Sequence, residues 1–191
     1  MSETPLSKDA YRRLHQELFG EHAGEGVYAV LDGASNEDLL EMLAERQPEH
    51  VCLYRGELAP DLAAVAPYLV RLRPDSVFTE WVVGEGWGGH WGIFAITDAD
   101  LTALRKHFRR FLMVKSPEGR RVYFRYYDPR VLRTFLPTCN AEELAELFGP
   151  VAEYVCEQED PAAGLRLWRE EGELHTAEIP VSEPSDSQRR S

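Results

Sequence analysis

Residues 27–31 read Val-Tyr-Ala-Val-Leu and are followed directly by Asp32-Gly33. Because the run is short and apolar at every position, it predicts a strand that is buried on both faces of a sheet. A helical pattern over residues 36–47 and a second apolar run at residues 51–54 come next. A helix between two buried strands favours a parallel arrangement, so this stretch predicts the first unit of an α/β or mixed sheet.

Further elements lie on both sides of this unit. An amphipathic pattern bounded by a serine and a glycine predicts an N-terminal helix over residues 7–19. Residues 68–72 alternate in polarity and predict a half-exposed strand. The run at residues 91–96 is apolar on both faces and predicts a second central strand, which a glycine-rich turn at residues 84–89 introduces.

The remaining segments complete one domain. Residues 98–110 predict a helix that begins at Asp98, and residues 112–114 and 122–127 predict an antiparallel hairpin. We therefore expect an α/β fold with a single compact domain over residues 1–177, built on a mixed β-sheet flanked by helices. Residues 178–191 are rich in proline and serine and predict a disordered tail.

The composition is that of a globular protein. Of the 191 residues, 43% are hydrophobic and 28% are charged, which excludes wholesale disorder and fibrous folds. No apolar stretch approaches the roughly 20 residues that span a bilayer, and the N-terminus lacks a signal-peptide pattern. Cys52, Cys139 and Cys156 form no close pair and indicate neither a disulfide scaffold nor a zinc knuckle. We expect a cytoplasmic protein that binds no membrane.

Charge is distributed unevenly along the chain. The formal net charge is −12, which argues against general binding to nucleic acid. Residues 105–133 nevertheless hold ten Lys and Arg residues and only two acids, a window of +8 in a chain whose remainder carries −20. This segregation predicts a charged partner. A protein surface is favoured over nucleic acid, because the acidic remainder would repel a polyanion.

Candidate contact residues come from this window and from nearby aromatics. Arg105 and Arg109 lie one turn apart in the predicted helix, and Arg125 and Tyr127 share a face of the predicted strand. Arginines and enclosed aromatics supply much of the binding energy at interfaces. The partner-binding candidates are Arg105, Arg109, Arg125, Arg130, Trp87 and Tyr127. The alternative is a solvated helix face, with Arg125 and Arg130 paired internally to Asp128.

Three residues are expected to have structural roles. Asp128 precedes a proline and predicts a helix N-cap that also orients Arg125 or Arg130. Gly88 and Trp91 belong to a sharp turn from helix to strand, in which glycine relieves crowding beside Trp87 and Trp91. That turn is not typical of a phosphate-binding loop, because such loops follow a strand and precede a helix.

Motifs for catalysis and metal binding are missing from the sequence. There is no nucleophile elbow and no His-Glu-x-x-His pattern, and no two of the six histidines are four residues apart. We therefore expect no enzymatic activity, no metal and no cofactor. Two alternatives stay open. One is a hydrolase that uses Glu85, His90 and Asp128, which must then converge in one cleft. The other is a nucleic-acid-binding module that uses the basic window of residues 105–133.

Five blocks follow one another in order between residues 27 and 150. They are Tyr-Ala-Val-Leu-Asp-Gly-Ala (28–34), Leu-Tyr-Arg-Gly (53–56), Gly-Gly-His-Trp-Gly-Ile-Phe (88–94), Phe-Arg-Tyr-Tyr-Asp-Pro-Arg-Val-Leu (124–132) and Leu-Pro-Thr-Cys (136–139). In this order they resemble the type VI secretion effector-chaperone (adaptor) family, which was first catalogued as a domain of unknown function. The block at residues 124–130 is the sharpest.

The resemblance implies a bacterial, cytoplasmic, non-catalytic adaptor. Such a protein binds a cognate toxic effector before export and promotes its loading onto a VgrG-type spike. The implied partners are therefore the secreted effector and the spike protein, with no role for nucleic acid or membrane. The helix before Val27 and the acidic segment after Pro150 lie outside the five blocks.

Overall fold

The computed structural model describes residues 5–20, 25–115 and 119–182. The helices in these ranges are α1 (Lys8–Phe19), α2 (Leu39–Arg46), α3 (Pro60–Ala64), α4 (Val77–Gly86), α5 (Leu101–Arg109), α6 (Pro129–Phe135) and α7 (Ala141–Phe148), with short 3-10 turns η1 (Gly33–Ser35) and η2 (Leu136–Thr138). The strands are β1 (Gly26–Asp32), β2 (His50–Cys52), β3 (Pro67–Leu72), β4 (Gly92–Thr97), β5 (Met113–Lys115), β6 (Arg121–Tyr123), β7 (Glu153–Glu157), β8 (Ala163–Glu170) and β9 (Glu173–Pro180).

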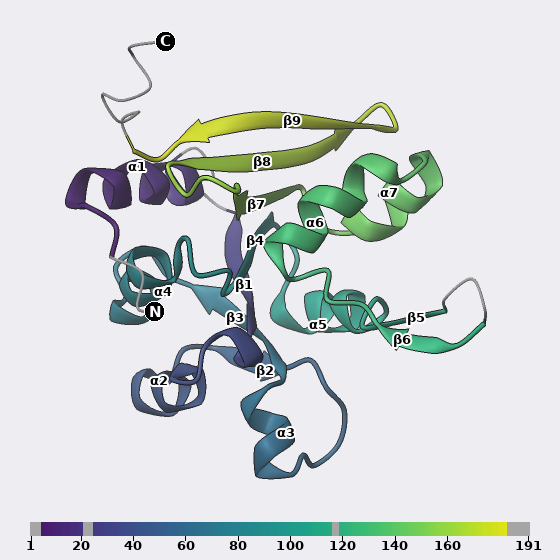
Figure 1. The fold of residues 1–191 in the computed structure, drawn as a ribbon, viewed down its shortest axis with the longest axis horizontal. Coiled ribbons are helices and arrows are strands. Elements are labelled where there is room, and N and C mark those ends of the chain that lie inside the picture. The colour runs from purple at the N-terminus through teal and green to yellow at the C-terminus, as the bar shows by residue number, and fades with distance from the viewer. Residues whose placement is uncertain (1–4, 21–24, 116–118, 183–191) are drawn as a thin grey trace.

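One seven-stranded sheet organises the domain. Its strands run in the order β2-β3-β1-β4-β7-β8-β9, and β5 pairs with β6 in a separate hairpin. Figure 1 shows the large sheet nearly edge-on, with β2 at the bottom, β9 at the top and the hairpin projecting to the right. The two runs expected to be central, residues 27–31 and 91–96, lie side by side as β1 and β4, so these predictions are confirmed.

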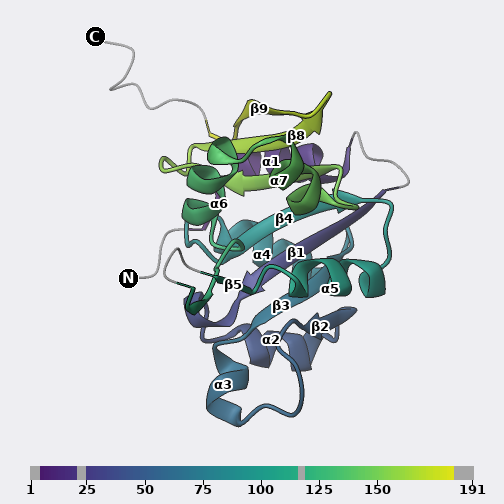
Figure 2. The same cartoon turned by 90° about the vertical axis from the view of Figure 1, so that its right-hand side faces the viewer.

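Helices cover both faces of the sheet and enclose two cores. In β1, Val27, Ala29 and Leu31 point into the core under α1, α2 and α4, whereas Tyr28 and Val30 point into the core under α5, α6 and α7. This alternation is the period of two expected of a strand. Figures 1 and 2 show the two helical layers on opposite sides of the sheet, and the expected α/β class is confirmed.

The expected parallel neighbours are replaced by antiparallel pairs. β1 and β2 run in the same direction, but β3 lies between them and pairs antiparallel with both. Every neighbouring pair of strands recorded in the sheet is antiparallel. β3 is also more enclosed than its sequence pattern predicts, because helices cover both faces of the sheet and leave only Arg71 of that strand exposed.

Two boundaries differ from the sequence prediction. The helix expected from Asp98 begins at Leu101, and the side chain of Asp100 caps it by accepting from the Ala103 amide at 2.8 Å. The tail expected from residue 178 starts too early, because β9 continues to Pro180 and Val181 is fully buried. The rest of the predicted tail, residues 183–191, lies outside the described residues.

Candidate partner-binding surfaces

The segment at residues 124–130 folds inward after the hairpin. The predicted strand over residues 122–127 ends at Tyr123, and the rings of Tyr126 and Tyr127 are buried. The Tyr126 hydroxyl donates to the Phe108 carbonyl at 3.1 Å and joins the segment to α5. The prediction that Arg125 and Tyr127 share one face of a strand is therefore wrong, because the strand ends at Tyr123 and the backbone turns before these two residues.

Two ion pairs fix this segment. Arg125 donates to the carboxylate of Asp32, which is 1% exposed at the end of β1. Asp128 accepts from the Arg130 amide at 2.9 Å as the N-cap of α6, and from Nε and Nη2 of Arg130 at 2.9 and 2.7 Å. Burial raises the pKa of Asp128, but the hydrogen bonds and charge of Arg130 outweigh it and hold that pKa below its ordinary value. The predicted cap and its pairing with Arg130 are confirmed.

Arg109 anchors the chain that leaves β2. Its guanidinium donates to the carbonyls of Leu53, Cys52 and Tyr54 at 2.9, 3.0 and 2.6 Å. Burial, followed by the charge of Arg105, lowers the pKa of Arg109, although a guanidinium still remains charged at neutral pH. Arg109 therefore holds a loop in place and has few donors left for a partner.

A hollow of about 230 Å³ opens beside this anchor. It lies between the loop that follows β2 and the β5–β6 hairpin, and its lining is Leu53, Tyr54, Arg55, Leu58, Leu62, Arg109, Leu112, Met113 and Tyr123. Tyr123 is 65% exposed and packs against Tyr54 with ring centroids 5.8 Å apart. We call these nine residues the hairpin surface. It combines exposed apolar and aromatic side chains with arginines at its rim.

Of the six predicted contact residues, only Arg109 lines the hairpin surface. Trp87 and Tyr127 are 5% and 3% exposed, so both rings belong to the core and are not available to a partner in the folded domain. Arg125 and Arg130 are engaged with Asp32 and Asp128. Arg105 is exposed and has no ion pair within the described parts of the chain.

The turn between α4 and β4 is built around a buried acid. Glu157, 3% exposed on β7, accepts from the amides of Gly88 and His90 and contacts the His90 imidazole. Burial raises the pKa of the Glu157 carboxyl, and the hydrogen bonds from Gly88 and His90 oppose that rise. Gly88 has a φ of 91°, which glycine adopts without strain, and Trp91 packs over the turn. The glycines that lie against the Trp91 ring are Gly86 and Gly89, where an added Cβ would come within 2.5 and 2.8 Å of it, so Gly88 serves the turn through its φ angle.

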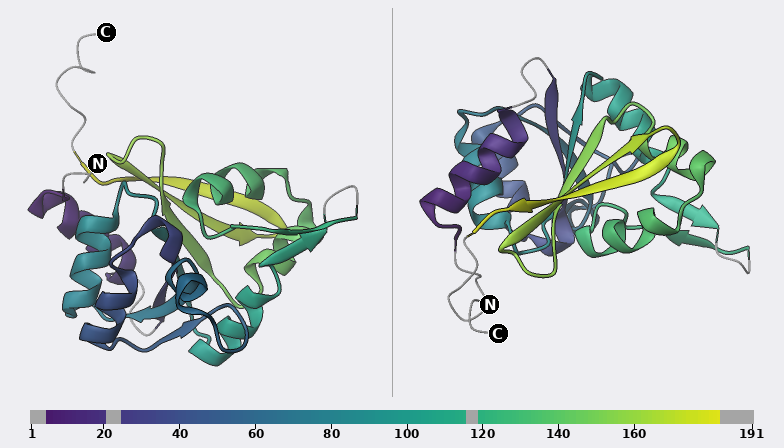
Figure 3. Two further views of the ribbon diagram at one scale, coloured as in Figure 1. Left: turned by 60° about the horizontal axis from the view of Figure 1, so that its bottom comes forward. Right: turned by 90° about the horizontal axis from the view of Figure 1, so that it is seen from above.

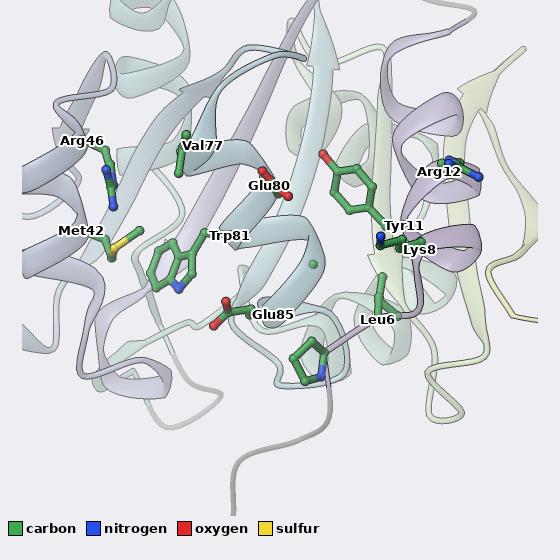
Figure 4. Close-up of a pocket in the computed structure, with 12 residues that line it drawn as sticks. Leu6, Lys8, Tyr11, Arg12, Met42, Arg46, Val77, Glu80, Trp81 and Glu85 are labelled. Atoms are coloured by element: carbon green, nitrogen blue, oxygen red, sulfur yellow. The ribbon is translucent and has the colours of Figure 1, made fainter.

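A larger groove of about 690 Å³ lies on the other face of the sheet (Figure 4). Helices α1, α2 and α4 form it, and its apolar lining includes Leu6, Met42, Val77 and Trp81. Charged side chains of both signs surround that lining: Lys8, Arg12, Arg46, Glu80 and Glu85. We call this feature the helical groove. The sequence shows no motif for it, because its walls come from three separate helices.

The hydrolase alternative requires a convergence that the structure does not provide. Glu85 lines the helical groove, His90 contacts Glu157, and Asp128 is bound by Arg130. No recorded contact joins these three side chains within the described residues. Within residues 5–20, 25–115 and 119–182, no group of three His, Cys, Asp or Glu side chains is placed to hold a metal ion. No helix in these described ranges is both long enough and apolar enough to cross a membrane.

The sequence reasoning missed two acids that organise these surfaces. Asp32 and Glu157 each end a buried apolar strand, and this position is the signal that could have identified them. A carboxylate at the end of a buried strand needs partners, and the nearest cation in space is distant in sequence. Their partners Arg125 and His90 come from other elements, which the local pattern does not reveal.

Comparison with known proteins gives one match. The family model described as "Domain of unknown function (DUF4123)" matches residues 27–146, a span that contains all five sequence blocks. Neither curated proteins nor solved structures gave a match. Helix α1 and strands β7, β8 and β9 lie outside the matched residues.

Proposed function

Since the chain belongs to the DUF4123 family, we propose that it is a non-catalytic adaptor that binds a cognate type VI secretion effector and promotes its loading onto a VgrG-type spike protein. The match over residues 27–146, together with the five blocks that resemble effector chaperones, is the observation that carries the proposal. The work would be done in the bacterial cytoplasm, before export. Binding alone is required of the chain, and no bond is made or broken.

The hairpin surface supports binding of a protein. Apolar and aromatic side chains in a hollow serve as anchors when a partner encloses them, and Tyr123, Met113 and Leu62 are all at least 40% exposed. Arg55 is exposed in the lining of this hollow, and Arg105 is exposed and close enough to Arg109 for its charge to act on that residue. Both would complement acidic side chains of a partner. We assign this surface to the effector.

The helical groove supports a second contact. It lies between α1, α2 and α4, on the opposite face of the sheet from α5. Two partners placed on opposite faces do not compete for space, which is what an adaptor between an effector and a spike requires. We assign the groove to the spike. An apolar lining with charged side chains around it suits a helix or loop that inserts an apolar side chain.

Co-purification with the products of the neighbouring genes tests the proposal. We expect Arg105→Glu combined with Tyr123→Ala to reduce recovery of the effector by about tenfold, because the variant loses an aromatic anchor and reverses a rim charge. Both side chains are exposed, so the melting temperature should stay nearly unchanged. Arg73→Glu is the matched control, an exposed arginine with the same charge change outside both surfaces.

The groove is tested separately with Val77→Asp, which places a charge on a side chain that is 55% exposed. We expect this variant to keep the effector and lose the spike protein. If the unmodified chain retains neither product, the proposed function is refuted. If the Arg105 and Tyr123 variant and the Arg73 control retain the effector equally, the assignment of the hairpin surface is refuted.

A further inference from the structure

Strand β9 forms one edge of the large sheet. It is the last strand in the order β2-β3-β1-β4-β7-β8-β9, and it pairs with β8 over its whole length, from Glu170↔Glu173 to Ala163↔Pro180. Figure 3 (right) shows β9 running across the molecule with no described helix or strand in front of it. An edge of this length offers a row of backbone groups to which another chain can pair.

The turn between β8 and β9 fixes which backbone groups face outward. Glu171 and Gly172 have φ angles of 51° and 88°, as in the two-residue type I′ turn. The flanking pair Glu170↔Glu173 then exchanges both hydrogen bonds, and bonding alternates along the ladder. His175, Ala177 and Ile179 therefore bond to β8, whereas the amides and carbonyls of Leu174, Thr176 and Glu178 point away from the sheet.

Two observations agree with this assignment. Val181 continues the alternate series of residues whose backbone groups point toward β8, His175, Ala177 and Ile179, and its amide donates to the Ala162 carbonyl at 2.9 Å. Pro180 has the outward parity, and proline in a sheet is found where an edge strand presents its backbone nitrogen to solvent. The outward edge thus offers three N–H donors in a row at alternate residues.

The charge around this edge selects the partner. Four glutamates at or beside β9 are exposed: Glu170, Glu171, Glu173 and Glu178. Arg169 is the one exposed Lys or Arg between residues 169 and 180. One carboxylate oxygen of Glu178 also accepts from Nε2 of Gln158 at 3.2 Å.

We propose that the β9 edge binds an extended segment of a partner protein that is rich in Lys or Arg, which adds to the sheet as an eighth strand. Backbone hydrogen bonds to Leu174, Thr176 and Glu178 supply the pairing, and the glutamates select basic side chains. A second copy of this chain is disfavoured, because antiparallel pairing of two β9 strands would gather eight glutamates along one ribbon.

This inference goes beyond the proposed function, since the edge lies outside both the hairpin surface and the residues that match the family model. The probe is a fluorescent synthetic peptide of alternating Lys and Thr. The control peptide has proline in place of every Thr, so it keeps the charge and cannot add to a sheet. Failure here would leave the effector experiment unaffected.

Hydrogen exchange gives the sharpest readout. In the free full-length chain the amides of Leu174, Thr176 and Glu178 should exchange quickly, and those of His175 and Ala177 slowly. The Lys-Thr peptide should slow exchange of the first group. Protection of that group in the free chain would overturn the proposal, because the edge would already be occupied. Equal binding of the two peptides in fluorescence polarisation would also overturn it, because charge alone would then explain the affinity.

Variants test the edge from the side of the protein. Thr176→Pro removes one outward donor and no bond to β8, and Thr176→Ser is its control. We expect the proline variant to bind the peptide about tenfold more weakly, because it loses the backbone hydrogen bond donated by residue 176 and weakens the adjacent bonds of the ladder. Should Thr176→Pro unfold the domain, Glu173→Lys with Glu178→Lys keeps the backbone intact and is expected to weaken binding at least as much. Unchanged binding in that double variant contradicts the proposal.

Discussion

Asp128 offers the most direct test of how the block at residues 124–130 works. Replacing Asp128 with alanine removes the cap of α6 and the partner of Arg130. A cap of this kind contributes about 1 kcal/mol. The ion pair adds no more than about 0.5 kcal/mol, because the Arg130 side chain is 54% exposed and water screens its charge. We expect Asp128→Ala to lower the free energy of unfolding by about 1–2 kcal/mol.

The same residue has a signed pH dependence. The pKa of Asp128 is lower in the folded chain than in the unfolded chain, so its contribution is present above the unfolded pKa of about 3.9. That contribution is lost as the pH falls through the folded pKa. The difference between the wild type and Asp128→Ala should therefore be full at pH 7 and shrink below about pH 4.

Urea unfolding of both proteins at pH 7 and at acidic pH measures this difference. Asp38→Ala is the matched control, because Asp38 stands at the N-cap of α2 without a side-chain cap bond, and its loss should stay within about 0.5 kcal/mol. A loss below about 0.5 kcal/mol for Asp128→Ala, or one equal to that of Asp38→Ala, would refute the structural role of Asp128.

Two further predictions concern packing and burial. In α4, an added Cβ at Gly84 would lie 3.8 Å from the Tyr11 ring, whereas one at Gly86 would lie 2.5 Å from Cε3 of Trp91. Gly84→Ala should therefore be neutral or stabilise the protein by up to about 1 kcal/mol. Gly86→Ala should destabilise it by about 1–3 kcal/mol, and denaturant unfolding measures both effects. Shifts of the same sign would show that Trp91 does not require glycine at residue 86. Burial raises the pKa of Cys156 to about 12, so iodoacetamide at pH 8 should leave Cys156 unmodified in the native chain and alkylate it in denaturant, as mass spectrometry would show. Rapid native alkylation of Cys156 would contradict its burial.

Local patterns predicted the elements that local interactions define. The apolar runs identified β1 and β4 as central, and Asp128 was identified as a cap because both partners of a cap lie within a few residues. The strand order was not predictable in the same way. β3 takes the place between β1 and β2 because its register with both strands buries its apolar residues, which is a comparison across the chain.

The candidate surfaces were less predictable than the fold. The positive window was visible in the sequence, but Tyr127 lies in the core, Arg109 is bound to backbone carbonyls, and Arg125 pairs with Asp32, 93 residues away in the chain. β9 was missed because Glu173, His175, Thr176 and Glu178 give it the composition of a loop. An edge strand has less apolar surface to bury than a central one, so its sequence carries a weaker pattern.

The position of β1 has a consequence for synthesis of the protein. β1 leaves the ribosome before both strands that flank it in the sheet, β3 and β4, and Ala29 pairs there with Val70 and Phe94. Until those residues emerge, an apolar strand with two bare edges is open to any other nascent or misfolded chain. Truncation after β2 would leave a fragment that lacks both strands flanking β1. Such a fragment should not fold alone, and it should gain structure only when it is mixed with the fragment that carries β3 and β4.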